Sequence, residues 1–192
     1  MSRFTEAELR ATARTKTTVY ESSERVLRAS AEYPTYDVFL SHARIDADLI
    51  LGIKVTLEKS GNSVYVDWID DPHLDRANVS AATAATLQRR MNQSRSLIYA
   101  TSPRSSRSVW MPWELGYFNG IKSAESIAIL PIEGTGSYPG QEFVGLYPLA
   151  EKGYASGTVA PRVVITRGGP LRRRTKSLDA LIAGADHYRL DT

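Results

Sequence analysis

Two tryptophans and a glutamate share a short stretch, VWMPWELGYFNG (residues 109–120), whose residue types could do chemistry. Proline is tolerated only in the first turn of a helix, so Pro112 predicts a helix that begins within a few residues before it. Trp110 and Glu114 are four residues apart and share one face of this helix. The positive end of the helix dipole favours the ionised form of Glu114. The stretch therefore predicts a carboxylate beside an aromatic wall.

A single carboxylate of this kind suits cleavage of the bond between nicotinamide and ribose in NAD. The reaction builds positive charge on the sugar, and the leaving group is already a cationic pyridinium that needs no general acid. One anion can therefore suffice, whereas ordinary glycosidases need two carboxyl groups. Trp110 and Trp113 are candidates to stack on a nicotinamide ring or a nucleobase. A structural interpretation stays open, because glutamate is common in the first turn of helices.

The elements that must position these residues alternate along the chain. Short apolar runs typical of buried strands (36–42, 63–68, 95–102, 126–132) are separated by stretches typical of helices (46–61, 78–94, 112–124). Residues 162–167 are expected as a fifth strand and residues 177–188 as a last helix. This alternation predicts the α/β class, with an open parallel sheet covered by helices on both faces.

Ligands of open parallel sheets bind beyond the carboxyl ends of the strands. The residues at these ends are Ser41, His42 and Arg44 after the first strand, Asp67 and Trp68 at the second, and Thr101 and Ser102 at the third. We expect them on one rim with Trp110 and Glu114. His42 suits a base or a phosphate ligand, although a polar residue that closes a strand is the more frequent interpretation.

Composition restricts the function further. The chain has 192 residues with a formal net charge of +3 and 42% hydrophobic residues, which is typical of a soluble globular protein and does not favour a nucleic-acid binder. It has no cysteine and three histidines, so we expect no metal site. No apolar run approaches the roughly 20 residues that span a bilayer, and the N-terminus lacks the apolar core of a signal peptide. A cytoplasmic protein without membrane contact is expected.

The first part of the chain has a different pattern. Residues 1–33 mix charges of both signs with sparse apolar residues, and Thr5 and Glu8 match a capping box. We expect a short helical N-terminal extension, packed on the body or on a partner, before a main domain at residues 34–192. A solvated arm is the alternative.

Several motifs resemble a known family. The stretch YDVFLSHARIDAD (36–48) resembles the first box of TIR (Toll/interleukin-1 receptor) domains. Trp110 and Glu114 have the W-x-x-x-E spacing of bacterial TIR proteins, and GQEFVGLYP (140–148) is similar to the same group. The resemblance covers about residues 35–150 and implies a flavodoxin-like parallel sheet with helices on both faces, the TIR fold.

The resemblance implies an NAD glycohydrolase or ADP-ribosyl cyclase in which Glu114 is catalytic. The first-box loop and the end of the second strand help to hold the dinucleotide in this family, which points to Ser41, His42, Arg44, Asp67 and Trp68. Many bacterial members serve Thoeris-type antiphage defence, in which a cyclic ADP-ribose signal activates a separate effector protein. NAD is then a substrate, and no cofactor is expected.

Catalytic TIR domains commonly build composite sites between protomers, so the resemblance also implies self-association. The loop IDDPHLDRANVS (69–80) governs assembly and site access in the family, and here it lacks the usual glycine before the next helix. We expect its charges at Asp70, Asp71 and Arg76 to serve contacts between copies.

Other interpretations remain. A non-catalytic TIR adaptor that acts by TIR–TIR assembly is the main alternative to the enzyme, although it has no need of the pair Trp110 and Glu114. A receiver domain would use Asp67 as phospho-acceptor, but no acidic pair follows the first strand. The acidic run at residues 67–75 lacks the spacing of a calcium loop. The arginines at 172–174 could contact phosphate or nucleic acid, although a solvated loop is favoured.

Overall fold

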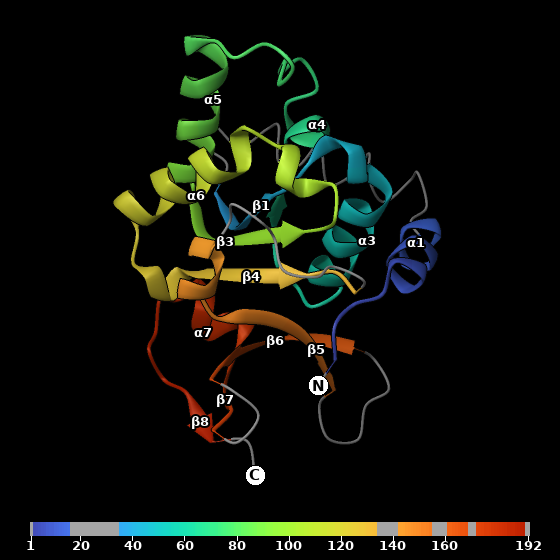
Figure 1. Cartoon of the computed structure of the whole chain (residues 1–192), viewed down its shortest axis with the longest axis vertical. Helices are drawn as coiled ribbons and strands as arrows, with labels where there is room; N and C mark the ends of the chain where they lie inside the picture. Colours follow the sequence, from blue (N-terminus) through green and yellow to red (C-terminus); the bar gives the residue numbers. More distant parts are fainter. Residues whose placement is uncertain (1, 16–34, 134–141, 155–160, 169–171, 191–192) are drawn as a thin grey trace.

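The computed structural model describes residues 2–15, 35–133, 142–154, 161–168 and 172–190. These residues form one mixed sheet with helices packed on it. Its eight strands follow the order β2-β1-β3-β4-β5-β6-β7-β8 (Figure 1). The strands are β1 (Tyr36–Ser41), β2 (Val64–Tyr65), β3 (Ser94–Thr101), β4 (Ile127–Pro131), β5 (Leu149–Tyr154), β6 (Pro161–Arg167), β7 (Arg174–Ser177) and β8 (Arg189–Leu190). The predicted α/β class is confirmed.

The parallel part of the sheet is as the sequence predicts, and the rest is a correction. In the series β2-β1-β3-β4-β5, each strand runs parallel to the next. Strand β6 pairs antiparallel with β5, β7 with β6, and β8 with β7. Residues 155–160 alone separate β5 from β6, which is too short for the crossover that a parallel pair needs. The sheet is therefore parallel in one half and antiparallel in the other.

Helices cover both faces of the sheet. They are α1 (Glu6–Arg14), α3 (Ala47–Glu58), α4 (Asp67–Asp70), α5 (Ala81–Asn92), α6 (Trp110–Ile121) and α7 (Leu178–Ile182), with short 3₁₀ turns η1 (Arg44–Asp46), η2 (Ser105–Arg107), η3 (Ala124–Ser126) and η4 (Glu142–Leu146). The predicted last helix is shorter than expected, because Gly184 adopts a φ of +65° soon after α7 and ends it. In the described residues, no helix has the length and apolarity to cross a membrane.

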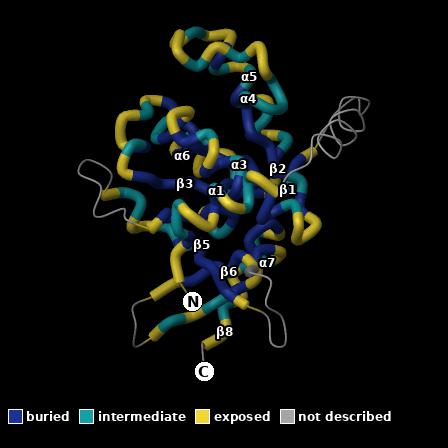
Figure 2. Tube along the Cα trace, turned by 90° about the vertical axis from the view of Figure 1, so that its right-hand side faces the viewer, coloured by how far each residue is buried: buried dark blue, intermediate teal, exposed yellow. Residues whose placement is uncertain are grey.

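The alternation of side chains along the strands produces two cores. Val38 and Leu40 of β1 pack with α1, α3 and α7 on one face, whereas Phe39 packs with α5 and α6 on the other. Leu97 and Ile98 of β3 divide between the two faces in the same way. Figure 2 shows the central strands as buried tube inside a surface of exposed loops, whereas β8 is exposed. Tyr99 follows Leu97 on the α5 and α6 face, which places a polar group beneath α6.

The described N-terminal residues pack on the body of the protein. Thr5 and Glu8 form the predicted capping box at the start of α1. Leu9 of α1 is buried against α3, where a Cβ at Gly52 would lie 2.2 Å from the Leu9 carbonyl oxygen. Phe4 is also buried and forms a bridge with Ile132. A solvated arm is thus wrong for residues 2–15, while most of the predicted extension and its boundary at residues 33 and 34 lie outside the described residues.

Candidate functional site

A cleft of about 480 Å³ lies beyond the carboxyl ends of the parallel strands. Its walls come from the residues that follow β1, from the loop before α5 and from the segment between β3 and α6. They include His42, Arg44, Arg76, Arg104, Arg107 and Trp110. The position agrees with the rule that ligands of such sheets bind at this edge.

Glu114 is fully buried and is connected to this cleft through Arg76, which lines it. Helix α6 begins at Trp110, so Pro112 occupies its first turn as predicted. The Ser41 hydroxyl donates to Glu114 Oε2 at 2.6 Å, and Arg76 Nη2 donates to Glu114 Oε1 at 2.6 Å. Both carboxylate oxygens therefore have partners. Arg76 lines the cleft and Glu114 does not, so the guanidinium separates the carboxylate from the open space.

Arg76 links Glu114 to a second buried carboxylate, Asp67. Arg76 Nη1 donates to Asp67 Oδ2 at 2.6 Å. Burial works to lower the pKa of Arg76, but the charges of Glu114 and Asp67 outweigh burial and raise it. Burial likewise works to raise the pKa of Asp67, yet His42 and Arg76 hold that pKa well below its usual range. One guanidinium thus bridges two carboxylates from different elements.

His42 ends this network on the far side of Asp67. Its Nδ1 lies 2.8 Å from the Leu40 carbonyl oxygen, and because a carbonyl can only accept, Nδ1 carries a proton. Its Nε2 lies 3.3 Å from Asp67 Oδ1, without the geometry of a hydrogen bond. A protonated ring would make this contact an ion pair. His42 therefore lies between Asp67 and the cleft, whose wall it helps to form.

Trp110 belongs to the core and to the cleft wall at once. Its side chain is 6% exposed and packs with α5 and the strands, which favours the structural interpretation of this residue. Its Nε1 donates to the Arg76 carbonyl oxygen at 2.9 Å, so the indole also fixes the loop that holds Arg76. The ring of Trp113 stands edge-on to Trp110, with centroids 5.4 Å apart, and stacks on Tyr117.

The structure brings together most of the predicted site residues, but not all. Ser41, His42, Asp67, Trp110 and Glu114 form one connected group, and exposed Arg44 lines the cleft. Trp68 and Trp113 are not among the residues that line it. Trp68, from α4, packs instead against the core that contains α3, and Trp113, from α6, packs against the core that contains α5. These positions do not favour the predicted substrate contacts.

Sequence reasoning missed four groups at the site, and Arg76, described above, is the first of them. Arg104 and Arg107, near the 3₁₀ turn after β3, line the cleft. Tyr99 pairs with Ser41 in the register of β3 and β1, so both side chains face α6. The Tyr99 hydroxyl is buried without a hydrogen-bond partner, and burial together with the charge of Glu114 raises its pKa. The alternation of Leu97, Tyr99 and Thr101 could have indicated this group.

The loop charges serve the fold. Asp71 accepts two hydrogen bonds from Arg90, at 2.7 Å each, and Asp70 accepts one from the Val66 amide. Arg76 is buried between carboxylates, so all three charges have partners within the protein, and the expected contacts between copies stay a prediction. Of the arginine cluster, Arg173 pairs with Glu151. No group of three metal-ligating side chains occurs in the described part of the chain.

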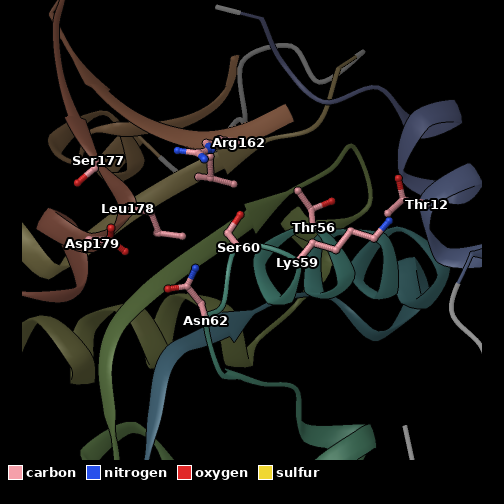
Figure 3. A pocket seen from close by; sticks show the side chains of 10 residues that line it. Thr12, Thr56, Lys59, Ser60, Asn62, Arg162, Ser177, Leu178 and Asp179 are labelled. Atoms are coloured by element: carbon pink, nitrogen blue, oxygen red, sulfur yellow. The ribbon is translucent and has the colours of Figure 1, made fainter. Parts of the chain in front are cut away.

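A second cleft, of about 550 Å³, lies between α1, the end of α3 and the segment from β6 to α7 (Figure 3). Lys59, Arg162 and Asp179 are its charged residues, and the others are small polar or aliphatic. Its described lining residues include no member of the Glu114 network and no aromatic side chain. The cleft at the carboxyl ends of the strands is therefore the stronger candidate.

Known proteins similar to this chain carry names that describe one activity. The chain is 54% identical over 121 residues to the "Probable 3' cyclic ADP-D-ribose synthase ThsB'" of Bacillus cereus (strain MSX-D12), a match that covers 62% of each protein. It is 36% identical over 83 residues, 43% of its length, to the "Putative cyclic ADP-D-ribose synthase TIR2" of Cytobacillus dafuensis, and spans 22% of that protein. No protein-family model matches the chain. The predicted resemblance to bacterial TIR proteins that form cyclic ADP-ribose is thus confirmed.

Proposed function

We propose that this chain, a relative of the cyclic ADP-D-ribose synthases, cleaves the nicotinamide–ribose bond of NAD and forms a cyclic ADP-ribose-type product. The observation that carries the proposal is the fully buried Glu114 carboxylate, which pairs with the cleft-lining Arg76. Its hydrogen bond from Ser41 fixes one oxygen. The names of both relatives describe the same activity, which supports the proposal.

The chemistry assigned to Glu114 is electrostatic. Positive charge develops on the ribose as nicotinamide leaves, and a preorganised anion stabilises that charge. A buried anion does so more strongly than an exposed one, because little water screens it. The Ser41 hydroxyl donates a hydrogen bond to the carboxylate and orients it.

Arg76 must leave Glu114 for the reaction to proceed. In the described arrangement the guanidinium lies 2.6 Å from the carboxylate, which neutralises the negative charge and covers it. Asp67 can retain Arg76 through its own 2.6 Å ion pair when Glu114 turns to the substrate. The arrangement is thus a resting state in which the catalytic anion is occupied.

A cyclic product requires that a nucleophile of the same molecule captures the ribosyl cation before water does. Exclusion of water from the cleft favours that outcome. The rim of the cleft carries exposed apolar side chains, with Ile45 64% and Val109 69% exposed. We infer that a second copy docks over this rim and closes the site. We also propose that the product activates a separate effector in antiphage defence and that the protein acts in the cytoplasm.

The proposal is tested by incubating the purified protein with NAD over a wide dilution series, with and without a crowding agent. Mass spectrometry then identifies the products. Nicotinamide and a cyclic ADP-ribose isomer are expected, with specific activity that rises with protein concentration. Unchanged NAD under every condition would overturn the proposal, and a flat specific activity would overturn self-association alone.

A second candidate function is a non-catalytic assembly module. The occupied carboxylate of Glu114 favours it, because in that role the contacts with Ser41 and Arg76 are only structural. Sedimentation velocity combined with the NAD assay separates the two functions. A protein that assembles but leaves NAD intact fits the module.

A further inference from the structure

Arg104 enters the cleft from the segment between β3 and η2, and a buried carboxylate holds it in place. Its Nε donates to Asp46 Oδ1 at 2.9 Å, and its Nη2 lies 2.7 Å from the same oxygen. The Asp46 side chain is 2% exposed, whereas that of Arg104 is 42% exposed and lines the cleft. These contacts use Nε and Nη2, which leaves Nη1 available to a ligand.

Asp46 is itself fixed by the chain around it. The Ser102 hydroxyl donates to Asp46 Oδ2, and the same Ser102 oxygen accepts from the amides of Arg104 and Ser105. Asp46 comes from the end of η1, after β1, and Ser102 directly follows β3, so the two parallel strands set the position of the guanidinium. A flexible surface arginine has no such support.

The charge of the cleft indicates what this guanidinium binds. Arg44, Arg104 and Arg107 are all on its walls, and none of its described lining residues is acidic. The planar guanidinium presents paired N–H donors that match phosphate oxygens, and such charge-assisted bonds are among the strongest in proteins. A dianionic group of extended shape fits several arginines better than a single carboxylate does.

We propose that Arg104, with Arg44 and Arg107, binds the diphosphate of the dinucleotide, and that Asp46 is a positioning residue that orients Arg104. The proposal rests on the proposed function, because it states which part of NAD these residues hold. It separates two tasks within one cleft. Glu114 acts on the ribose bond, and the arginines supply affinity for the bridge between the two nucleosides.

The experiment compares Arg104→Met, Arg104→Lys and Asp46→Asn with the wild type. Arg95→Met is the matched control, since Arg95 lies at the opposite end of β3 in an exposed ion pair with Asp37. Calorimetry measures the binding of ADP-ribose and of adenosine, which lacks the diphosphate. Melting temperatures confirm that each variant is folded.

Arg104→Met is expected to weaken ADP-ribose binding about tenfold, the loss typical of one charge-assisted contact, while adenosine binding is unchanged. Arg104→Lys retains part of the affinity, and Asp46→Asn weakens binding less than Arg104→Met does. In NAD turnover, these variants should have a raised KM, while kcat stays within about twofold of the wild-type value. The reason is that the contact with the diphosphate is equally strong in the ground state and in the transition state.

Wild-type affinity of Arg104→Met for ADP-ribose would overturn the diphosphate site, whether or not NAD is cleaved. An Asp46→Asn variant that binds like the wild type would overturn the positioning role. Arginine-dependent ADP-ribose binding by a protein that leaves NAD intact would support the site and overturn the proposed function. A wild type that binds no ADP-ribose would contradict both.

Discussion

Two clusters of buried charge lie in different parts of the sheet. In the antiparallel half, Lys176 Nζ donates to the carbonyl and carboxylate oxygens of Glu125, at 3.0 Å each, and to the Ala185 carbonyl oxygen at 2.8 Å. The Tyr188 ring lies 4.7 Å from the same nitrogen. In the parallel half, Glu114 and Asp67 share the single guanidinium of Arg76.

The difference lies in what surrounds each cluster. Lys176 uses all three of its protons within the protein, and neither described cleft includes it or Glu125. Arg76 lines a cleft together with His42 and three further arginines. Buried charge by itself therefore indicates only a satisfied network. A buried charged network indicates a binding site when it borders a cleft whose charge is opposite to that of the expected ligand.

Removal of the shared guanidinium is expected to have the largest effect on stability. Arg76→Met leaves two buried carboxylates without their partner, which typically costs about 3–5 kcal/mol in the free energy of unfolding. Urea denaturation measures the loss. Arg95→Met is the control and should change stability by less than about 1 kcal/mol, because its ion pair is exposed. Equal stabilities of the two variants would show that the network is not a structural unit.

Trp110→Ala tests how far the site depends on the core beside it. Loss of a buried tryptophan costs about 3–5 kcal/mol, and the variant also loses the hydrogen bond to the Arg76 carbonyl oxygen. Trp113→Ala is the matched variant and should cost less, because that ring is half-buried. Thermal denaturation of both variants measures the difference. A Trp110→Ala protein as stable as the wild type would assign the ring to the ligand alone.

Lys176→Met is expected to separate stability from activity. It removes hydrogen bonds from a charged donor and should lower the free energy of unfolding by about 2 kcal/mol. NAD turnover per folded molecule should not change, because Lys176 is remote from the cleft. Denaturation and a turnover assay on the same preparation give both values. A kcat that falls with this variant would mean that the two halves of the sheet are coupled.

The smallest expected effect is a change in acid stability at Asp71. Burial works to raise the pKa of Asp71, but hydrogen bonds from Arg90 and Tyr65 lower it below the ordinary value. The unfolded chain therefore takes up a proton first as pH falls below about 4, and the folded state loses the stability that this carboxylate contributes above that pH. Urea titrations at pH 7 and pH 3 should show a smaller loss for Asp71→Asn than for the wild type. An equal loss of stability in the two proteins would refute the lowered pKa of Asp71 in the folded state.

Local patterns predicted the elements around the site well. Pro112 fixed the start of α6 to within its first turn, and the alternation of runs predicted the parallel strands whose carboxyl ends meet. The antiparallel half was missed because β5 follows a loop and lacks a long apolar run. Its pairing with β6 depends on a short connection rather than on side-chain pattern.

The partners of Glu114 could not be predicted in the same way. Arg76 is 38 residues from Glu114, and Asp46 is 58 residues from Arg104. These pairs exist because a loop folds over the edge of the sheet, and no periodic pattern encodes that contact. Ser41 was foreseen as a rim residue, since its position depends only on where β1 ends. Arg76 was assigned to the surface, since a charged loop residue is ordinarily exposed.

The central claim, that Glu114 is the catalytic anion, is tested most directly by nicotinamide release from NAD in Glu114→Gln and in Glu125→Gln. Both substitutions keep the shape and remove one negative charge. The charge of Glu114 is fully buried behind Arg76, and that of Glu125 is partly buried in the Lys176 cluster. Loss of a preorganised charge should lower kcat about 10²–10³-fold in Glu114→Gln, while Glu125→Gln retains the wild-type kcat per folded molecule. Wild-type turnover by a folded Glu114→Gln protein would contradict the account.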